Sequence, residues 1–184
     1  MKTTIRKAYW NFEKEENWLN EMAAKGLALS DYSWCRYVFE DSLPGEYIYR
    51  IELLQYMASH PESIKYIRSM EESGAEHIAS YMRWVYFRKK ASSGAFDLFS
   101  DVESKIKHYS RVNSLLMTGA LLNLASGIIN TYLILTHILQ GEDFLLLNFF
   151  VAILNIAIFI ALFAVSCPIR KRVKKLKTEK SAAE

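Results

Sequence analysis

Cysteine is scarce in this sequence, which contains only Cys35 and Cys167, far apart and without a CxxC pair. Neither a disulfide framework nor a zinc site is therefore expected, and the chain suits a reducing compartment. Histidine offers no metal site either. No HxxxH or HExxH spacing occurs among the four residues His60, His77, His108 and His137.

Motifs of catalysis are also missing from the sequence. It contains neither a glycine-rich phosphate loop nor a GxSxG segment, and no acidic pair stands out on an apolar background. The opening residues MKTTIRKAYW include no apolar run long enough for a signal peptide. The sequence therefore predicts no enzyme, no metal and no cofactor. Any membrane targeting signal is expected in the C-terminal segments.

Two long apolar segments, residues 112–140 and 144–168, contain no aspartate, glutamate, lysine or arginine. Each exceeds the roughly 20 apolar residues that cross a bilayer. A pair of buried core helices is the alternative, but a helix that is apolar all round needs a larger protein to bury it. Two transmembrane helices are therefore predicted, joined by a short extracytoplasmic link at residues 141–143.

Basic residues flank the outer ends of both segments and are absent from the link. Lys105, Lys107 and Arg111 precede the first segment, and seven further bases lie in the tail at residues 169–184. The positive-inside rule then places both termini on the cytoplasmic side of a multi-pass membrane protein. The tail is expected to contact anionic lipid head groups, foremost through Arg170, Lys171, Arg172, Lys174 and Lys175.

Small and amide side chains form a stripe on each apolar segment, at helical spacings. Small residues allow two helices to approach closely, and asparagine amides can hydrogen-bond between helices in hydrocarbon. The stripes therefore predict the packing surface of a helical hairpin, with a polar pathway for a solute as the alternative. The predicted packing residues are Gly119, Asn123, Gly127, Asn130, Asn148, Ala152 and Asn155.

Residues 1–95 alternate between strand-like and helix-like segments in the order β-α-β-β-α-β. Residues 18–26 align with residues 66–74 at an offset of 48, and both segments end in glycine. Two βαβ halves related in this way predict an α+β, ferredoxin-like domain with one four-stranded sheet and both helices on one face. The expected strands are 3–10, 27–40, 47–54 and 75–89, and the expected helices are 12–25 and 61–73.

An amphipathic helix is predicted at residues 96–111, between this domain and the membrane. Phe99, Val102, Ile106 and Tyr109 recur at helical spacing there, around a capping box at residues 100–103. The helix is expected to continue into the first apolar segment and to form a stiff connection.

Alternation along the strands predicts two unlike faces of the sheet. Tyr37, Tyr49 and Phe87 share the phase expected beneath the helices, whereas Glu15 and Glu16 of the first helix are expected to be exposed. The opposite phase is rich in aromatic and arginine side chains, which is unusual for a solvated surface. It forms the candidate binding face, which consists of Tyr32, Trp34, Arg36, Arg50, Met82, Trp84, Tyr86 and Arg88.

Three interpretations of this face are possible. It is covered by another part of the protein or by a second copy of the chain, it binds a partner protein or a ligand, or it binds nucleic acid. Nucleic acid is disfavoured because residues 1–111 contain 16 basic and 16 acidic residues, and because the glycine-aromatic signature of base-stacking domains is missing.

The segment FEKEENWLNEMAAKGL at residues 12–27 resembles the opening of a bacterial family known as domain of unknown function 2812. Residues 47–51 and 84–89 look like other recurring segments of that family, and the likeness covers roughly residues 5–110. The resemblance implies a protein typical of Gram-positive bacteria that often ends in two or more spans. It also implies a gene often found beside a PadR-type transcriptional regulator, but it implies no chemistry and no site residues.

The sequence thus predicts a membrane-anchored regulatory or sensory module that binds a cytoplasmic protein partner and catalyses no reaction. A small-molecule-binding membrane protein and a structural subunit of a larger membrane complex are the alternatives. A closed pocket with one or two convergent polar groups would favour the small-molecule alternative.

Overall fold

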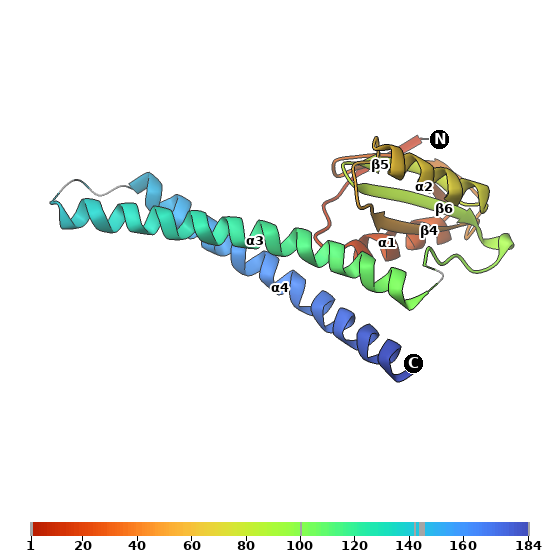
Figure 1. Ribbon diagram of the computed structural model, residues 1–184. Coiled ribbons are helices and arrows are strands. Elements are labelled where there is room, and N and C mark those ends of the chain that lie inside the picture. The colour runs from red at the N-terminus through yellow and green to blue at the C-terminus, as the bar shows by residue number, and fades with distance from the viewer. Residues whose placement is uncertain (1, 100, 142, 144–145, 184) are drawn as a thin grey trace. The chain divides into compact units, whose positions relative to one another are not determined.

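The computed structural model describes residues 2–99, 101–141, 143 and 146–183. The chain divides into two compact units, Met1–Ser104 and Lys105–Glu184. The first unit combines strands and helices, and the second is built from two long helices (Figure 1).

The first unit contains two three-stranded antiparallel sheets, with the strand orders β1-β3-β2 and β4-β6-β5. The α+β class is therefore confirmed, but the described strands do not form the single four-stranded sheet of the ferredoxin-like prediction. In chain order the elements are β1 (Lys2–Arg6), α1 (Phe12–Ala24), β2 (Leu27–Ser33), β3 (Arg36–Asp41), β4 (Tyr47–Leu53), α2 (Pro61–Glu72), β5 (Glu76–Tyr81) and β6 (Trp84–Lys90), followed by a short 3-10 turn at Ala91–Ser93.

The difference from the prediction arises at two hairpin turns. The predicted strand 27–40 is the hairpin of β2 and β3, and the predicted strand 75–89 is the hairpin of β5 and β6. The turn residues are Trp34-Cys35 and Met82-Arg83, whereas turns are usually marked by glycine, proline, asparagine or aspartate. Cys35 and Met82 instead adopt the left-handed region themselves, with φ of 61° and 55°.

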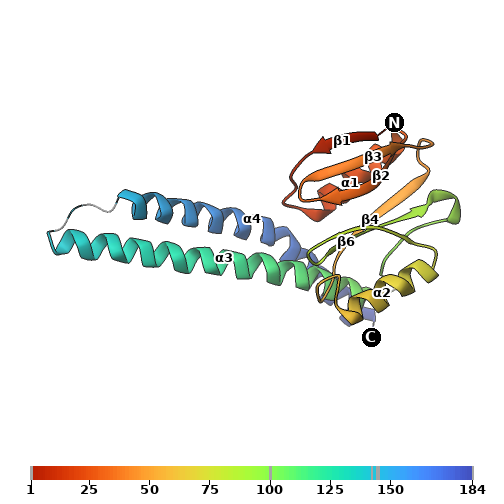
Figure 2. The same cartoon turned by 90° about the horizontal axis from the view of Figure 1, so that it is seen from above.

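The internal repeat extends over more structure than the sequence indicates. Each half has the order β-α-β-β, once in β1 to β3 and once in β4 to β6. The offset of 48 residues also relates a β-bulge between Leu29 and Asp31 to one between His77 and Ala79. The bulged strands β2 and β5 lie next to each other, and Figure 2 shows the two sheets as separate groups of strands.

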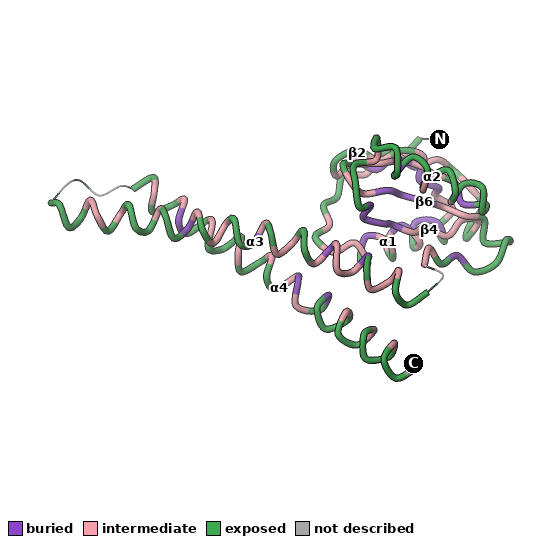
Figure 3. Tube along the Cα trace, viewed as in Figure 1, coloured by how far each residue is buried: buried purple, intermediate pink, exposed green. Residues whose placement is uncertain are grey.

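Two hydrophobic cores lie on opposite faces of the second sheet. The larger core joins α1, the first sheet and one face of the second sheet, and it includes Leu19, Phe39 and Tyr86. The smaller core contains Val85 and Phe87 and receives side chains from α2. Successive residues of a strand point to opposite faces, so β6 contributes to both cores. Figure 3 accordingly shows β4 and β6 as buried strands in the middle of the unit.

The register between β4 and β6 corrects the predicted division into two faces. Ile51 lies opposite Tyr86, and Tyr49 lies opposite Arg88. Directly opposite residues of an antiparallel pair point to the same face. Tyr49 and Ile51 therefore share a face with Tyr86 and not with Phe87. Alternation within each strand does not reveal how neighbouring strands align.

Helix α1 lies along the open edge of β4 and hydrogen-bonds the backbone there. Asn20 Oδ1 accepts from the Tyr49 amide at 2.8 Å, and Asn20 Nδ2 donates to the Tyr49 carbonyl at 3.2 Å. Glu16 Oε2 accepts from the Ile51 amide at 2.9 Å, and Glu16 Oε1 lies 3.3 Å from Arg50 Nη1. Unpaired edges of sheets invite association with other strands. Side chains of α1 close this edge.

Gly26 follows α1 with a φ of 81°, and a Cβ atom there would lie 3.0 Å from the Ser42 carbonyl oxygen. We expect Gly26→Ala to lower the free energy of unfolding by about 2–4 kcal/mol, because left-handed strain and steric overlap add. Gly45→Ala is the matched control, since Gly45 has a φ of 72° but no atom within 4 Å of such a Cβ. The control should lose about 1–2 kcal/mol from strain alone.

Urea unfolding monitored by tryptophan fluorescence measures both losses, because all four tryptophans lie in the first unit. Equal losses in the two variants would contradict the steric part of the argument.

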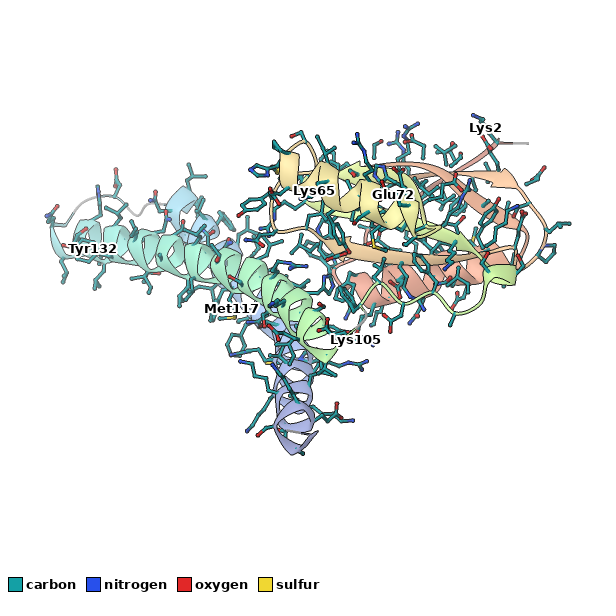
Figure 4. All side chains as sticks on the ribbon, turned by 45° about the vertical axis from the view of Figure 1, so that its right-hand side comes forward. Lys2, Lys65, Glu72, Lys105, Met117 and Tyr132 are labelled. Atoms are coloured by element: carbon teal, nitrogen blue, oxygen red, sulfur yellow. The ribbon has the colours of Figure 1, made fainter. Side chains whose placement is uncertain are left out.

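The second unit contains α3 (Val102–Leu139) and α4 (Leu146–Ala183), both long and apolar enough to cross a membrane. Their length and composition suggest membrane association. Large apolar side chains are exposed along both helices, as is Tyr132, labelled in Figure 4. Residues 102–111 of the predicted juxtamembrane helix and the first apolar segment form one element, because α3 runs from Val102 to Leu139. Residues 96–99 were predicted to be helical but are not, and Phe96 is buried in the smaller core instead. Residues 142, 144 and 145, where the predicted link meets the second segment, lie outside the described residues.

Hydrogen bonds between side chains join the two helices of the second unit at three levels. Asn148 Nδ2 donates to Asn130 Oδ1 at 3.0 Å, and Asn155 Nδ2 donates to Ser126 Oγ at 3.1 Å. The third bond, from Ser166 Oγ to Asn113 Oδ1 at 2.6 Å, involves two residues outside the predicted stripes. Ala152 is buried, a Cβ on Gly127 would lie 3.2 Å from Ile156, and one on Gly119 would lie 3.4 Å from Leu162. Asn123 instead donates to the Gly119 carbonyl of its own helix.

The predicted lipid-contact residues lie on the C-terminal part of α4, which remains helical to Ala183. The Arg170 guanidinium stands 4.6 Å from the ring centre of Phe163, and that of Arg172 stands 5.8 Å from Tyr109. Lys175 Nζ lies 3.7 Å from Glu179. Lys171 and Lys174 are exposed.

Candidate functional site: an aromatic cavity around a buried glutamate

A cavity of about 370 Å³ opens in the first unit, where both hairpin turns meet the start of α1. Its size falls in the range of about 300–1,000 Å³ typical of ligand pockets. Eight of its eleven lining residues are aromatic. The lining consists of Ala8, Tyr9, Trp10, Phe12, Glu15, Tyr32, Trp34, Cys35, Tyr81, Trp84 and Tyr86. The two β-α-β-β halves thus contribute their equivalent hairpins to one site.

Glu15 of α1 is the acidic residue of this cavity, and only 8% of it is exposed. The hydroxyls of Tyr37 on β3 and Tyr86 on β6 both donate to its Oε1 atom at 2.7 Å. Burial raises the pKa of the Glu15 carboxyl above its ordinary value, although the two hydrogen bonds oppose this shift. Burial also raises the pKa of both phenols, so that they remain protonated donors.

No basic residue faces Glu15 within the described part of the chain. Its hydrogen bonds there come from the two tyrosines, and none of the residues that line the cavity is lysine, arginine or histidine. A buried carboxylate without a counter-ion is costly. The cavity therefore combines one acidic side chain with aromatic rings, and its described lining contributes no basic side chain.

The aromatic rings stand at several angles around the cavity. The Tyr32 ring centre lies 4.4 Å from Tyr86 and 6.2 Å from Tyr81, and the Tyr32 and Tyr81 planes are nearly perpendicular at 86°. Phe12 and Trp84 pack at 5.9 Å. Trp10 and Trp34 are exposed and must therefore stand at the rim. The rings therefore line the cavity in several orientations.

The structure distributes the eight residues of the predicted binding face over different environments. Tyr32, Trp34, Trp84 and Tyr86 line the cavity together. Met82 is exposed at a hairpin turn. The three arginines are engaged in ion pairs, Arg36 with Asp31 at 2.9 Å, Arg50 with Glu16 at 3.3 Å and Arg88 with Glu76 at 2.7 Å. These residues do not make up one flat surface.

Glu15 is the functional candidate that the sequence interpretation missed, because it was expected on the exposed side of the helix. Its position contained a signal, since it precedes Leu19 by four residues and Met22 by seven. Residues at these spacings occupy one face of a helix, and both Leu19 and Met22 are buried. The rim residues Ala8 to Trp10 lie in the loop between β1 and α1, where no periodic pattern could reveal them.

Metal binding finds no support in the geometry. Among the described residues, no group of three or more histidine, cysteine, aspartate or glutamate side chains comes together as a metal site. Cys35 lines the cavity as a free thiol beside aromatic rings. The site can therefore enclose, stack on and hydrogen-bond a ligand, with Glu15 as its charged group.

A family model described as "Protein of unknown function (DUF2812)" matches residues 11–121, more than half of the chain. The chain belongs to this family. The resemblance of residues 12–27, 47–51 and 84–89 is thereby confirmed. No curated protein and no solved structure matches the chain.

The part of the chain that matches DUF2812 runs from the N-cap of α1 through β6 and ends within α3. It contains Glu15 and seven other cavity residues, while Ala8, Tyr9 and Trp10 precede it. The cavity is thus built largely from the segment that defines the family. Since the family has no assigned function, a function has to be argued from the chemistry of this site.

Proposed function

We propose that this DUF2812 protein is a membrane-anchored sensory module whose soluble domain binds a small organic molecule in the aromatic cavity and catalyses no reaction. The observation that supports the proposal is one buried carboxyl surrounded by eight aromatic residues in a cavity of ligand size. Small-molecule sites are usually apolar and aromatic, with a few polar groups that fix the orientation of the ligand.

The side chains around the cavity are held in place by packing and hydrogen bonds, which favours a ligand-binding site over a packing defect. Tyr37 and Tyr86 belong to the larger core and hold the Glu15 side chain in place through their hydroxyls. Tyr32 packs on both of these rings, at 4.8 Å and 4.4 Å. Groups fixed before binding lose little conformational entropy when a ligand arrives.

The membrane part of the proposal combines the two long helices with the distribution of charge. Basic residues lie in the first turns of α3 and in the C-terminal part of α4, at the outer ends of the two apolar segments. This distribution supports a multi-pass protein with both termini in the cytoplasm and the tail at anionic lipids. Since α3 begins at Val102 in the first unit and continues to Leu139, one helix runs from the sensory unit through the apolar segment. Such a helix is a physical route for a signal.

A cytoplasmic protein partner is the second candidate. Three large side chains near the cavity are strongly exposed, namely Trp10 at 77%, Trp34 at 73% and Met82 at 62%. Exposed apolar groups that lie together often mark interaction sites. A partner of this kind would depend on Trp34 and Met82 and would tolerate a filled cavity.

A thermal-shift screen of the full chain in mild detergent tests the proposed function. Compounds that bind the cavity should raise the melting temperature of the first unit, because a ligand that binds only the folded state stabilises it. Three of the four tryptophans line the cavity, so the same compounds should change the tryptophan fluorescence.

A cavity-filling variant provides the control for this screen. Ala8 lines the cavity and is exposed, so Ala8→Phe can occupy the space without disturbing either core. The thermal shifts should disappear in Ala8→Phe and persist in Ile64→Ala, whose side chain is exposed on α2. Shifts that survive in Ala8→Phe, or the absence of any stabilising compound, would count against the proposal.

A further inference from the structure

The wall of the cavity has the chemistry of a cation site. Eight aromatic residues supply rings whose faces carry a negative electrostatic potential and attract cations. Glu15 supplies the only acidic side chain among the described lining residues, and no lining residue supplies a positive charge. The rings and the carboxyl therefore favour the same sign of charge in a ligand.

Other classes of ligand fit this wall poorly. An anion would meet Glu15 with no basic residue of the lining to offset the repulsion. A metal ion would find one carboxylate where several oxygen ligands are needed. A neutral apolar molecule would offer the Glu15 carboxyl neither a counter-ion nor a hydrogen-bond partner.

An alkylated ammonium ion satisfies both parts of the wall. Its charge is spread over methyl or methylene groups, so it can leave water easily and contact several rings at once. It also needs no set of hydrogen-bond acceptors beyond one carboxylate. The ring planes of Tyr32 and Tyr81, at 86° to each other, can contact such a rounded group from two sides.

We infer that the aromatic cavity binds a small organic cation with an alkylated ammonium group, with Glu15 as its counter-ion. The inference rests on the proposed function, because it names the ligand class of the same cavity. Tyr37 and Tyr86 are positioning residues in this arrangement, since their hydroxyls fix Glu15 Oε1. The carboxylate becomes the preferred state of Glu15 when the cation is present.

Choline and 3,3-dimethylbutan-1-ol form the decisive pair of probes, because they have nearly the same shape and differ in charge. We expect choline and tetramethylammonium to bind the full chain in detergent, measured by tryptophan fluorescence at constant ionic strength. The neutral alcohol should bind at least about tenfold more weakly, since it lacks the attraction to the rings and to Glu15.

The variant Glu15→Gln separates the contribution of the Glu15 charge from that of the aromatic rings. Glutamine keeps an acceptor for Tyr37 and Tyr86 but removes the charge, so the preference for choline over the alcohol should shrink. Trp84→Leu should weaken the binding of both probes, since it removes a ring that lines the cavity and leaves Glu15 unchanged. Ile64→Ala should bind as the wild type does.

The pH dependence supplies a readout that a merely structural role of Glu15 would not change. Choline keeps its charge at every pH, so any change in affinity reports on the protein. Burial raises the pKa of Glu15 above 4.5, hence choline affinity should rise with pH through that raised pKa and remain flat in Glu15→Gln. The titratable groups around the cavity besides Glu15 are Cys35 and the phenols of Tyr9, Tyr32, Tyr37, Tyr81 and Tyr86. The Lys7 ammonium lies 4.8 Å from the ring centre of Tyr9.

Three results would overturn the inference. Equal binding of choline and the alcohol would show that the charge of the ligand does not matter, and an unchanged preference in Glu15→Gln would show that Glu15 is not the counter-ion. Absence of binding by choline, tetramethylammonium and larger tetraalkylammonium ions at millimolar concentration would also exclude this ligand class. The proposed function would then depend on the screen with Ala8→Phe, which makes no assumption about charge.

Discussion

The variant Glu15→Leu should have a free energy of unfolding about 2–5 kcal/mol lower than that of the wild type. The hydroxyls of Tyr37 and Tyr86 would lose their acceptor while they remain buried. Leucine has a similar volume, so a new cavity contributes little to this loss. Urea unfolding of the full chain in detergent, monitored by tryptophan fluorescence, measures the difference in the first unit.

The triple variant Glu15→Leu, Tyr37→Phe, Tyr86→Phe is the matched control for this prediction. It removes the acceptor and both donors together, and replacing all partners of a buried hydrogen bond by apolar groups is nearly neutral. We therefore expect its free energy of unfolding to lie within about 1 kcal/mol of the wild type. A triple variant as unstable as Glu15→Leu would show that the loss comes from packing.

A stable triple variant would have a functional meaning. It would show that the first unit folds without the buried carboxyl, so that stability alone does not require Glu15. A buried polar group that contributes nothing to net stability is a candidate for recognition. The triple variant should accordingly show the same reduced preference for choline over the alcohol as Glu15→Gln while it keeps its fold.

The helices of the first unit could be predicted closely from the sequence, whereas its strand arrangement could not. The expected helix 12–25 is Phe12–Ala24, and the expected helix 61–73 is Pro61–Glu72. Asn11 and His60 supply the N-cap side chains, and Gly26 and Gly74 follow with positive φ. Caps of this kind are local chemistry, and local chemistry is visible in one sequence.

The strands depend on two features that are not local. The turns at Trp34-Cys35 and Met82-Arg83 contain no typical turn residue, so each hairpin resembled a single long strand. The register of β4 against β6 decides which side chains share a face, and it is fixed only when the strands meet.

Part of the candidate site could be predicted from the sequence. The aromatic residues Tyr32, Trp34, Trp84 and Tyr86 were identified as a group, because four rings in two strands are conspicuous in a neutral domain. Glu15 was not identified, since an acidic residue in a helix with several others is usually solvated. Only the packing of α1 against both sheets turns it inward.

The internal repeat predicts equivalent helices, but the contacts of α1 and α2 differ. At the offset of 48, Ile64 and Arg68 of α2 correspond to Glu16 and Asn20 of α1. An isoleucine cannot accept a hydrogen bond from a strand amide, so α2 cannot repeat the contacts that Glu16 and Asn20 make to β4. Only the first β-α-β-β half therefore has a helix whose side chains hydrogen-bond the open edge of β4.

Asn20→Ala should lower the free energy of unfolding by about 2–4 kcal/mol, because the Tyr49 amide and carbonyl would both lose a partner in a partly buried position. Asn17→Ala is the matched control, since Asn17 is exposed on the same helix, and its effect should stay within about 0.5 kcal/mol.

Asn20→Asp tests the direction of the two bonds at the β4 edge. Aspartate still accepts from the Tyr49 amide but cannot donate to the Tyr49 carbonyl, so its loss should fall between those of Asn20→Ala and Asn17→Ala. The open edge in Asn20→Ala should also favour association of chains, which size-exclusion chromatography in detergent can follow. If Asn20→Ala and Asn17→Ala unfold alike and stay equally dispersed, α1 does not protect this edge.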